Sequence, residues 1–151
     1  MKFTPFKINS FLLFKLPSAF IVGARVKHIS DKESIVKIKH RWINQNPFKS
    51  MFWAVQGMSA ELSTGILVMQ SIHNSGKKIS MLVTNMDATF SKKATGKITF
   101  TCKQGEEINS VIEKAIKTKE GQTLVLTSEG VNTDGVVVSK FNFEWSLKLK
   151  Q

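Results

Sequence analysis

Between Lys49 and Lys77 the chain carries a single charged side chain, that of Glu61. A run of this length could cross a bilayer, but a carboxylate near its centre is costly in lipid, and other polar side chains interrupt the run. Those side chains are Gln56, Ser59, Ser63, Thr64 and Gln70. We therefore expect that this run is a long buried helix in a soluble protein and that the helix ends near residues 74–76. Because this helix is apolar nearly all round, a sheet must wrap it or a partner must cover it.

The rest of the chain contains the strands that such a sheet needs. Over residues 34–42, Val36, Ile38, His40 and Trp42 alternate with basic residues, which is typical of a half-buried strand. We expect a short helix at 10–16, a surface helix at 106–118, and strands at 23–30, 34–42, 78–90, 96–103, 122–127 and 136–150. These elements predict an α+β fold in which a curved antiparallel sheet surrounds the long helix. The length fits one domain, residues 1–151.

The helix ends have recognisable signals. Asn46 or Ser50 is expected to be the N-cap of the long helix, with Pro47 in its first turn. Gly76 is expected to end that helix, and Gly121 to end the surface helix.

The charge is strongly positive and unevenly placed. The formal net charge is +11, and residues 1–49 carry ten Lys and Arg against two acids. Such an excess suggests a polyanionic partner, which could be nucleic acid, an anionic membrane surface, or a phosphate-rich small molecule such as coenzyme A. The alternative is a lysine-rich solvated surface, and the sequence leaves both interpretations open.

Cysteine and histidine exclude several kinds of site. A single cysteine, Cys102, allows no internal disulfide framework and no cysteine-based zinc site. The three histidines show no spacing that suggests a metal site, so we expect no metal.

Lys15 and Pro17 interrupt the N-terminal apolar stretch, which leaves too short a core for a signal peptide. We therefore expect a cytoplasmic protein.

Glu61 is the strongest candidate for chemistry. A buried carboxylate without partners is costly in its ionised form. Such a group is either satisfied by structural contacts, or its raised pKa is used for proton transfer. The sequence alone leaves both roles open for this side chain.

Four segments carry a resemblance to a known family. They are Leu16-Pro-Ser-Ala-Phe20 with Gly23, Arg41-Trp-Ile-Asn44, Asn46-Pro-Phe-Lys-Ser50, and Ala60-Glu-Leu-Ser-Thr-Gly65. In their order and spacing, over about residues 10–150, the chain resembles the hot-dog fold. More narrowly, it resembles the thioesterases related to phenylacetyl-CoA thioesterase.

The resemblance implies a homodimer or a dimer of dimers, with active sites at the subunit interface near the N-terminal half of the central helix. A helix carboxylate would act on an acyl-CoA thioester as general base or nucleophile, with no other cofactor, and Glu61 matches its position. Asn46 matches a loop amide that orients the thioester and water. Thr64, one turn after Glu61, could bind its carboxylate or the attacking water.

The resemblance also implies the binding surfaces around this carboxylate. Backbone N–H groups of Phe52, Trp53 and Ala54 would stabilise the oxyanion, although the family's usual His-Gly-Gly is absent there. Phe52, Trp53 and Met58 would line the acyl pocket. Lys92 and Lys93 would contact the phosphates of coenzyme A. The alternative is that both are solvated side chains of a β-turn.

Two other functions compete with hydrolysis. The missing His-Gly-Gly favours a non-catalytic hot-dog protein that binds acyl-CoA or lipid. The charge alone would favour a nucleic-acid binder, but the chain lacks the aromatic-plus-basic motifs of single-strand readers. We therefore expect no nucleic-acid partner and no membrane insertion.

Overall fold

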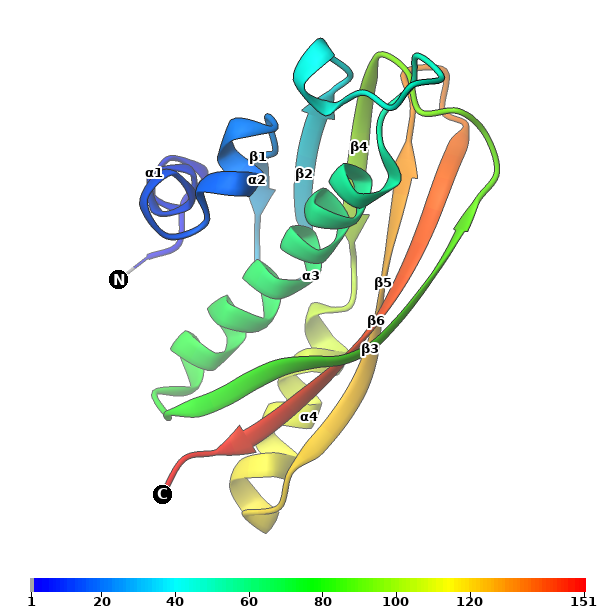
Figure 1. Cartoon of the computed structure of the whole chain (residues 1–151). Coiled ribbons are helices and arrows are strands. Elements are labelled where there is room, and N and C mark those ends of the chain that lie inside the picture. Colours follow the sequence, from blue (N-terminus) through cyan, green and yellow to red (C-terminus); the bar gives the residue numbers. More distant parts are fainter. Residues whose placement is uncertain (1) are drawn as a thin grey trace.

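The computed structural model describes residues 2–151 and consists of a curved sheet wrapped around one long helix (Figure 1). The helices are α1 (Pro5–Lys15), α2 (Pro17–Ile21), α3 (Trp53–Ser75) and α4 (Gly105–Thr118), with a 3-10 helix η1 (Trp42–Asn44). The strands are β1 (Arg25–Ile29), β2 (Ser34–Lys39), β3 (Ile79–Phe90), β4 (Lys97–Cys102), β5 (Gln122–Val131) and β6 (Val137–Leu149). The predicted α+β architecture is therefore confirmed.

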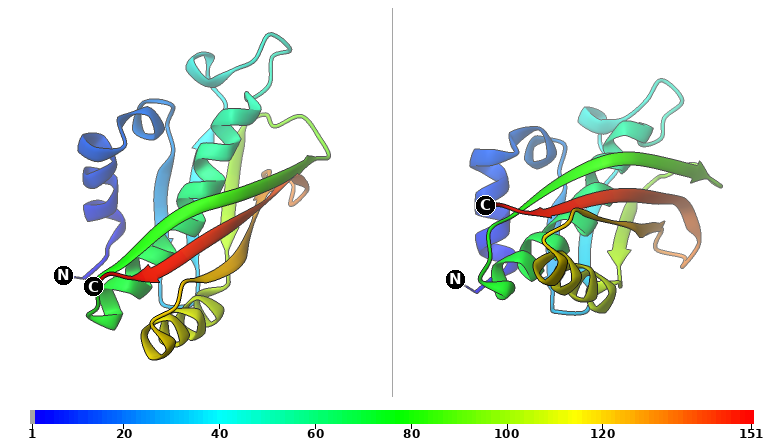
Figure 2. Two further views of the ribbon diagram at one scale, coloured as in Figure 1. Left: turned by 60° about the horizontal axis from the view of Figure 1, so that its bottom comes forward. Right: turned by 90° about the horizontal axis from the view of Figure 1, so that it is seen from below.

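All six strands form one antiparallel sheet in the order β1-β2-β4-β5-β6-β3. The hairpin β5–β6 joins the two halves of the sheet, and β1 and β3 are its edges. Figure 2 shows how β3 and β6 cross over α3 while α4 lies below them. The sheet thus covers α3 from one side and leaves α1 and α2 to cover part of the other.

Helix α3 is held in the sheet by polar contacts as well as by apolar packing. The Ser34 hydroxyl of β2 donates to the Ser63 carbonyl, and the hydroxyls of Ser63 and Ser128 lie 2.7 Å apart. Gly76 ends the helix in a left-handed conformation, with φ 66°. The predicted end is therefore confirmed, and Ser63 and Thr64 of the helix are buried where they bond to neighbouring strands.

The predicted N-cap of α3 is wrong. The helix begins at Trp53 with Phe52 as its N-cap, and no side chain caps it. The Asn46 side chain instead closes a turn, because its oxygen accepts from the backbone N–H groups of Phe48 and Ser50. The backbone N–H of Met51 then donates a hydrogen bond to the Ala94 carbonyl, and this bond holds the loop against the β3–β4 connection.

The strand predicted for residues 34–42 ends at Lys39, so the prediction that Trp42 lies on its buried face is also wrong. Trp42 is 82% exposed and begins η1. The cause is Asn44, whose buried amide donates to the carbonyls of Val22 and Lys39 and whose oxygen accepts from the Arg41 N–H. These bonds turn the chain out of the sheet.

Helix α1 is longer than the predicted 10–16. Thr4 caps it by accepting from the Lys7 N–H, and Pro5 occupies the first turn. The Asn9 side chain exchanges two hydrogen bonds of 2.9 Å with the backbone of Val26 in β1. This pair fixes α1 beside the edge of the sheet.

The last third of the chain follows the prediction closely, except that β5 continues to Val131. Lys119, with φ 59°, is the C-cap of α4, in place of the expected Gly121. On β6, Phe141, Phe143, Trp145 and Leu147 are buried.

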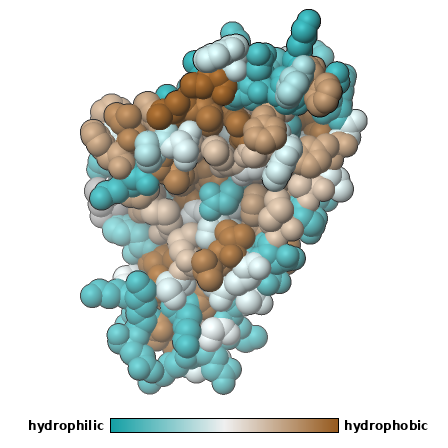
Figure 3. All heavy atoms as spheres, in the orientation of Figure 1, coloured by the Kyte–Doolittle hydropathy of each residue, from teal (hydrophilic) through white to brown (hydrophobic). Residues whose placement is uncertain are grey.

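Within residues 2–151, no helix combines the length and hydrophobicity required to cross a membrane. On the face seen in Figure 3, hydrophobic side chains gather at the upper left and in the middle, whereas hydrophilic ones lie along the upper right edge and cover the lower part.

Candidate active site

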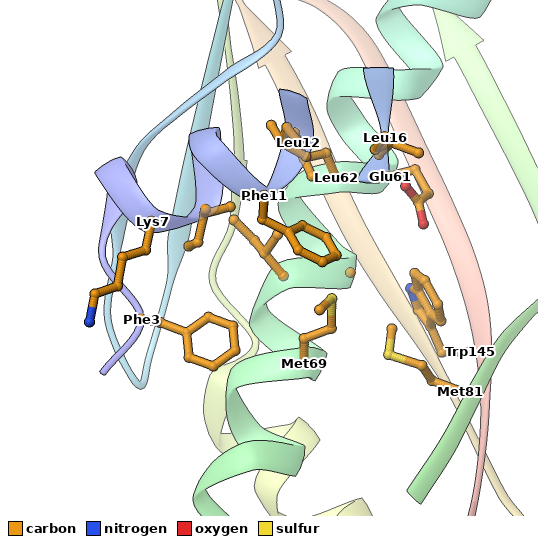
Figure 4. Close-up of a pocket in the computed structure, with 13 residues that line it drawn as sticks. Phe3, Lys7, Phe11, Leu12, Leu16, Glu61, Leu62, Met69, Met81 and Trp145 are labelled. Atoms are coloured by element: carbon orange, nitrogen blue, oxygen red, sulfur yellow. The ribbon is translucent and has the colours of Figure 1, made fainter. Parts of the chain in front are cut away.

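Glu61 lies on the third turn of α3 and faces a cavity between this helix and α1. Figure 4 shows its carboxylate pointing along α3 toward the ring of Trp145, with Met81 of β3 beyond. The cavity has a volume of about 250 Å³. Its walls are almost entirely apolar: Phe3, Ile8, Phe11, Leu12, Leu16, Leu62, Gly65, Ile66, Met69, Met81 and Trp145. Lys7 also lines it, but its ammonium group points away from the other lining side chains (Figure 4).

The carboxylate of Glu61 has an unusual electrostatic environment. Burial raises its pKa above the ordinary value for a glutamate. Among residues 2–151, no group donates a hydrogen bond to this carboxylate or forms an ion pair with it. Of the structural contacts that the sequence left open for this carboxylate, those within residues 2–151 are therefore absent, and contacts with a partner subunit stay a prediction.

Gly65 lies beside both Glu61 and Trp145. A methyl group added at Gly65 would lie 3.4 Å from the Glu61 Oε1 atom and 3.4 Å from the Trp145 ring. Gly65 and Met69 follow Glu61 at intervals of four residues, so the three line one face of α3. The cavity therefore extends along the helix from the carboxylate.

Thr64 holds Trp145 in place. Its hydroxyl accepts from the Trp145 indole N–H at 3.0 Å and donates to the backbone carbonyl of Glu61 at 2.9 Å. Its one proton is therefore directed to the backbone of Glu61 and not to the carboxylate. In this structure Thr64 positions a wall of the cavity.

Four of the other predicted residues line a second groove, of about 390 Å³. Its lining includes Asn46, Trp53, Lys92 and Lys93, but not Glu61. Phe90, the last residue of β3, also lines it. One chain thus brings the predicted loop amide, helix start and basic turn together, and keeps them apart from the predicted carboxylate.

The start of α3 borders this second groove. As the first residues of the helix, Trp53 and Ala54 have N–H groups without partners inside it, as an oxyanion site requires. The prediction for the third amide is wrong, because the Phe52 N–H donates to the Asn44 carbonyl at 2.9 Å. The ring of Phe52 meets that of Trp53 edge to face, with 5.9 Å between centroids. Met58 is half-buried and lines neither the groove nor the cavity, so the cavity beside Glu61 differs in its lining from the predicted acyl pocket.

One further polar residue lies at the second groove. Gln56 is buried and lines the second groove. Its amide nitrogen donates to the Met51 carbonyl, while its Oε1 atom lacks a hydrogen-bond partner within residues 2–151. Only the position of this glutamine in the charge-free run could have indicated it. In the part of the chain that the structure describes, no cluster of His, Cys, Asp and Glu is placed to hold a metal ion.

The fold is shared with several solved structures. PA5026 of Pseudomonas aeruginosa, a protein of unknown function described as a probable thioesterase, is 19% identical, with 97% of each chain covered and a TM-score of 0.83. The thioesterase PA1618 of the same organism is 12% identical, with 99% of this chain and 97% of the other covered and a TM-score of 0.77. The thioesterase HI1161 of Haemophilus influenzae is 14% identical, with 99% and 93% covered and a TM-score of 0.72. The chain therefore has the hot-dog fold.

The sequence also identifies the family. Residues 7–147 match the model described as "Domain of unknown function (DUF4442)", and the chain belongs to this family. No curated protein matches the chain at a significant level.

Proposed function

We propose that this protein hydrolyses acyl thioesters, with acyl-CoA as substrate, and that Glu61 is its catalytic carboxylate. The observation that carries the proposal is a carboxylate that has no partner within residues 2–151 and faces an apolar cavity of about 250 Å³. A carboxylate whose pKa is raised by burial is suited to proton transfer near neutral pH. The adjoining cavity accepts hydrocarbon and offers few polar groups that would favour water. The shared fold with proteins described as thioesterases supports the same reaction class.

In the proposed reaction, water adds to the thioester carbonyl carbon and the carbon–sulfur bond then breaks. Glu61 takes a proton from the water and delivers it to the departing sulfur, so that a carboxylic acid and a free thiol result. Direct attack by Glu61 would instead form an anhydride, which water would cleave. Single turnover in isotopically labelled water separates these modes, because cleavage of the anhydride at Glu61 leaves the label on that side chain.

The active site would be completed by a second copy of the chain. Strand β3 is an edge of the sheet, and no strand within residues 2–151 pairs with its outer side. It is 12 residues long and exposes Leu82, Met86 and Phe90. A long apolar edge of this kind is a template for pairing with another strand. A two-fold dimer through β3 would continue the sheet from one subunit into the next.

Antiparallel pairing of two β3 strands would also join the two halves of the site. Met81, near the start of β3, lines the Glu61 cavity, and Phe90, at its end, lines the Asn46 groove. In an antiparallel pair the start of one strand lies beside the end of the other. The Glu61 cavity of one subunit would then meet the Asn46 groove and α3 start of its partner. The amides of Trp53 and Ala54 could there stabilise the oxyanion.

Mixing two inactive variants tests both parts of the proposal. Glu61→Gln and Asn46→Ala proteins are assayed for thiol release from acyl-CoAs of graded length, first separately and then after mixing under conditions that exchange subunits. Mixed dimers would contain one intact site each. The mixture should therefore recover about a quarter of the wild-type rate, because half of randomly formed two-fold dimers are mixed. A mixture that stays as inactive as its components would place both residues in one subunit's site, or in none.

One observation favours a binding function without hydrolysis. Bulky rings replace glycines at the α3 start, where Phe52 and Trp53 are 43% and 55% exposed. If these rings block the approach of the carbonyl to the backbone amides, the protein would bind acyl-CoA or lipid without turnover. Calorimetric binding of a medium-chain acyl-CoA that remains intact over hours would support this second function.

A further inference from the structure

A basic groove lies on the face of the sheet opposite to α3, away from Glu61. The groove, of about 460 Å³, runs across β1, β2 and β4. It is lined by Gly23, Arg25, Lys27, Lys37, Ile38, Lys39, Arg41 and Lys97. Six of these residues are cationic, and among residues 2–151 no acidic side chain lines the groove.

The register of the strands places like charges directly opposite one another. Arg25 of β1 pairs with Lys37 of β2, and Lys39 of β2 pairs with Lys97 of β4. Like charges in such positions destabilise a sheet. Within residues 2–151, the basic and acidic side chains that approach within 4.0 Å are His28 with Glu33 and Lys32 with Glu106, so no residue of the groove has an acidic partner. The fold therefore maintains a repulsive cluster that nothing in the described chain neutralises by a salt bridge.

Arg25 is held in a defined position, and Arg41 lies over Gly23. The Arg25 guanidinium donates to the carbonyls of Phe20 and Ala24 at 2.7 and 2.8 Å, and its central carbon lies 3.6 Å from the centre of the Phe20 ring. Burial, and then the nearby charge of Arg41, lower the pKa of Arg25 from its ordinary value. The Arg41 guanidinium occupies the space where a side chain at Gly23 would lie, and Gly23 has a φ of 100° that favours glycine.

We propose that this groove binds a small ligand that carries two or more phosphate groups. A planar guanidinium matches the geometry of phosphate oxygens, and lysines supply additional point charges. The volume of the groove is in the range of small-molecule sites. The phosphate groups of such a ligand would lie between the opposing cations and be attracted to both, which would offset the repulsion between the cations. It would also account for the basic excess of the N-terminal third, which hydrolysis by Glu61 does not use.

Macromolecular polyanions fit the groove less well. Among residues 2–151, no aromatic side chain lines it, so nucleic-acid bases would have no stacking surface there. Ile38, its single apolar lining residue, is buried and offers no anchor in a lipid surface. Because the groove and the Glu61 cavity lie on opposite faces of the sheet, the proposal does not depend on thioester hydrolysis.

Two triple variants with the same loss of charge test the proposal. Lys37→Gln/Lys39→Gln/Lys97→Gln changes the groove. Lys78→Gln/Lys114→Gln/Lys117→Gln changes exposed lysines elsewhere and is the matched control. Binding of inorganic tripolyphosphate is measured by calorimetry at low salt. We expect wild type and control to bind alike, and the groove variant to bind at least about tenfold more weakly, which corresponds to the loss of one charged contact of about 1.4 kcal/mol.

A folding control separates binding from a structural role. Because the groove variant removes both like-charge oppositions, its thermal midpoint without ligand should equal or exceed that of wild type. Coenzyme A is titrated as a second probe. Equal weakening for both probes would show that coenzyme A also binds this groove through its phosphates, at a site separate from the Glu61 cavity. Weakening for tripolyphosphate alone would identify a separate phosphorylated effector.

Three results would overturn the proposal. The first is equal tripolyphosphate affinity in all three proteins, and the second is equal weakening in both variants, which would reflect net charge only. The third is groove-dependent binding of a single-stranded oligonucleotide or of anionic phospholipid vesicles by a protein that does not bind tripolyphosphate. That last result would assign the groove to a macromolecular partner.

Discussion

Replacing Gly65 by alanine should stabilise the protein and at the same time narrow its cavity. An added methyl group would meet the Glu61 carboxylate and the Trp145 ring at 3.4 Å, which is ordinary contact without overlap. In a helix interior, alanine is favoured over glycine by about 1 kcal/mol. For a chain of this size, a gain of about 1 kcal/mol raises the thermal midpoint by roughly 2–4 °C.

The same methyl group should weaken activity on the longest acyl chains. Its volume is comparable to the roughly 30 Å³ that one water molecule occupies, so about one methylene of substrate is displaced from the cavity. Losing burial of one methylene costs about 0.8 kcal/mol. The expected result is therefore a decrease of about fourfold in kcat/KM for the longest substrate that wild type accepts, since 1.36 kcal/mol is tenfold. Shorter substrates should be unaffected.

Gly57→Ala is the matched control for this prediction. Gly57 lies two turns earlier on α3, where an added methyl group would contact the Phe141 ring at 3.4 Å, and it does not line the cavity. This variant should gain similar stability and keep the wild-type preference for chain length. A fall in the thermal midpoint of Gly65→Ala would refute the geometry at the cavity. An unchanged chain-length profile would show that the acyl group does not bind there.

Three further predictions concern buried groups. Thr64→Val should lower the free energy of unfolding by about 1–3 kcal/mol in urea titrations, because the Trp145 indole N–H loses its acceptor. Thr64→Ser keeps a hydroxyl and should retain most of the stability. Equal stability of the two variants would contradict this role of the hydroxyl. Because burial raises the pKa of Glu61, the native state binds its proton more tightly than the unfolded state does, and stability falls as pH rises through the native-state pKa. Glu61→Gln should therefore have a higher thermal midpoint than wild type at pH about 8, with the difference disappearing near the unfolded-state pKa of about 4.3; a pH-independent difference would argue against a buried, ionisable carboxylate. Burial raises the pKa of the Cys102 thiol to about 11. This thiol should therefore react with a thiol reagent at pH about 8 only at the rate of unfolding. Rapid labelling of the native protein would show that Cys102 is accessible to solvent.

Much of the fold can be predicted from local sequence. The charge-free run specifies α3, and Gly76 specifies its end. The alternation on β6 specifies a strand with one buried face, because period-2 patterns are read directly from neighbouring residues. The N-cap prediction for α3 failed because Asn46 instead accepts from the N–H groups of Phe48 and Ser50 within its own turn. The prediction for Trp42 failed because one of the deciding bonds is not local. Asn44 turns the chain by bonding to Val22, far earlier in the sequence.

The site was predictable only in part for the same reason. The isolation of Glu61 in the sequence indicated its burial, but the cavity beside it depends on α1. The Asn9 bonds to Val26 place that helix, and the Thr64 bond to Trp145 places the opposite wall. Contacts between such distant residues leave no periodic signal. The separation of Glu61 from Asn46 in one chain likewise became visible only in three dimensions.

The central claim is that the carboxylate of Glu61 hydrolyses thioesters, and the most direct test is the kcat/KM of Glu61→Gln on a medium-chain acyl-CoA. The variant is compared with wild type by the release of free thiol, after circular dichroism and thermal unfolding have shown that it is folded. We predict measurable wild-type turnover and a decrease of at least about 100-fold in the variant, the effect expected for loss of a general base. Equal rates in the two folded proteins would contradict the account.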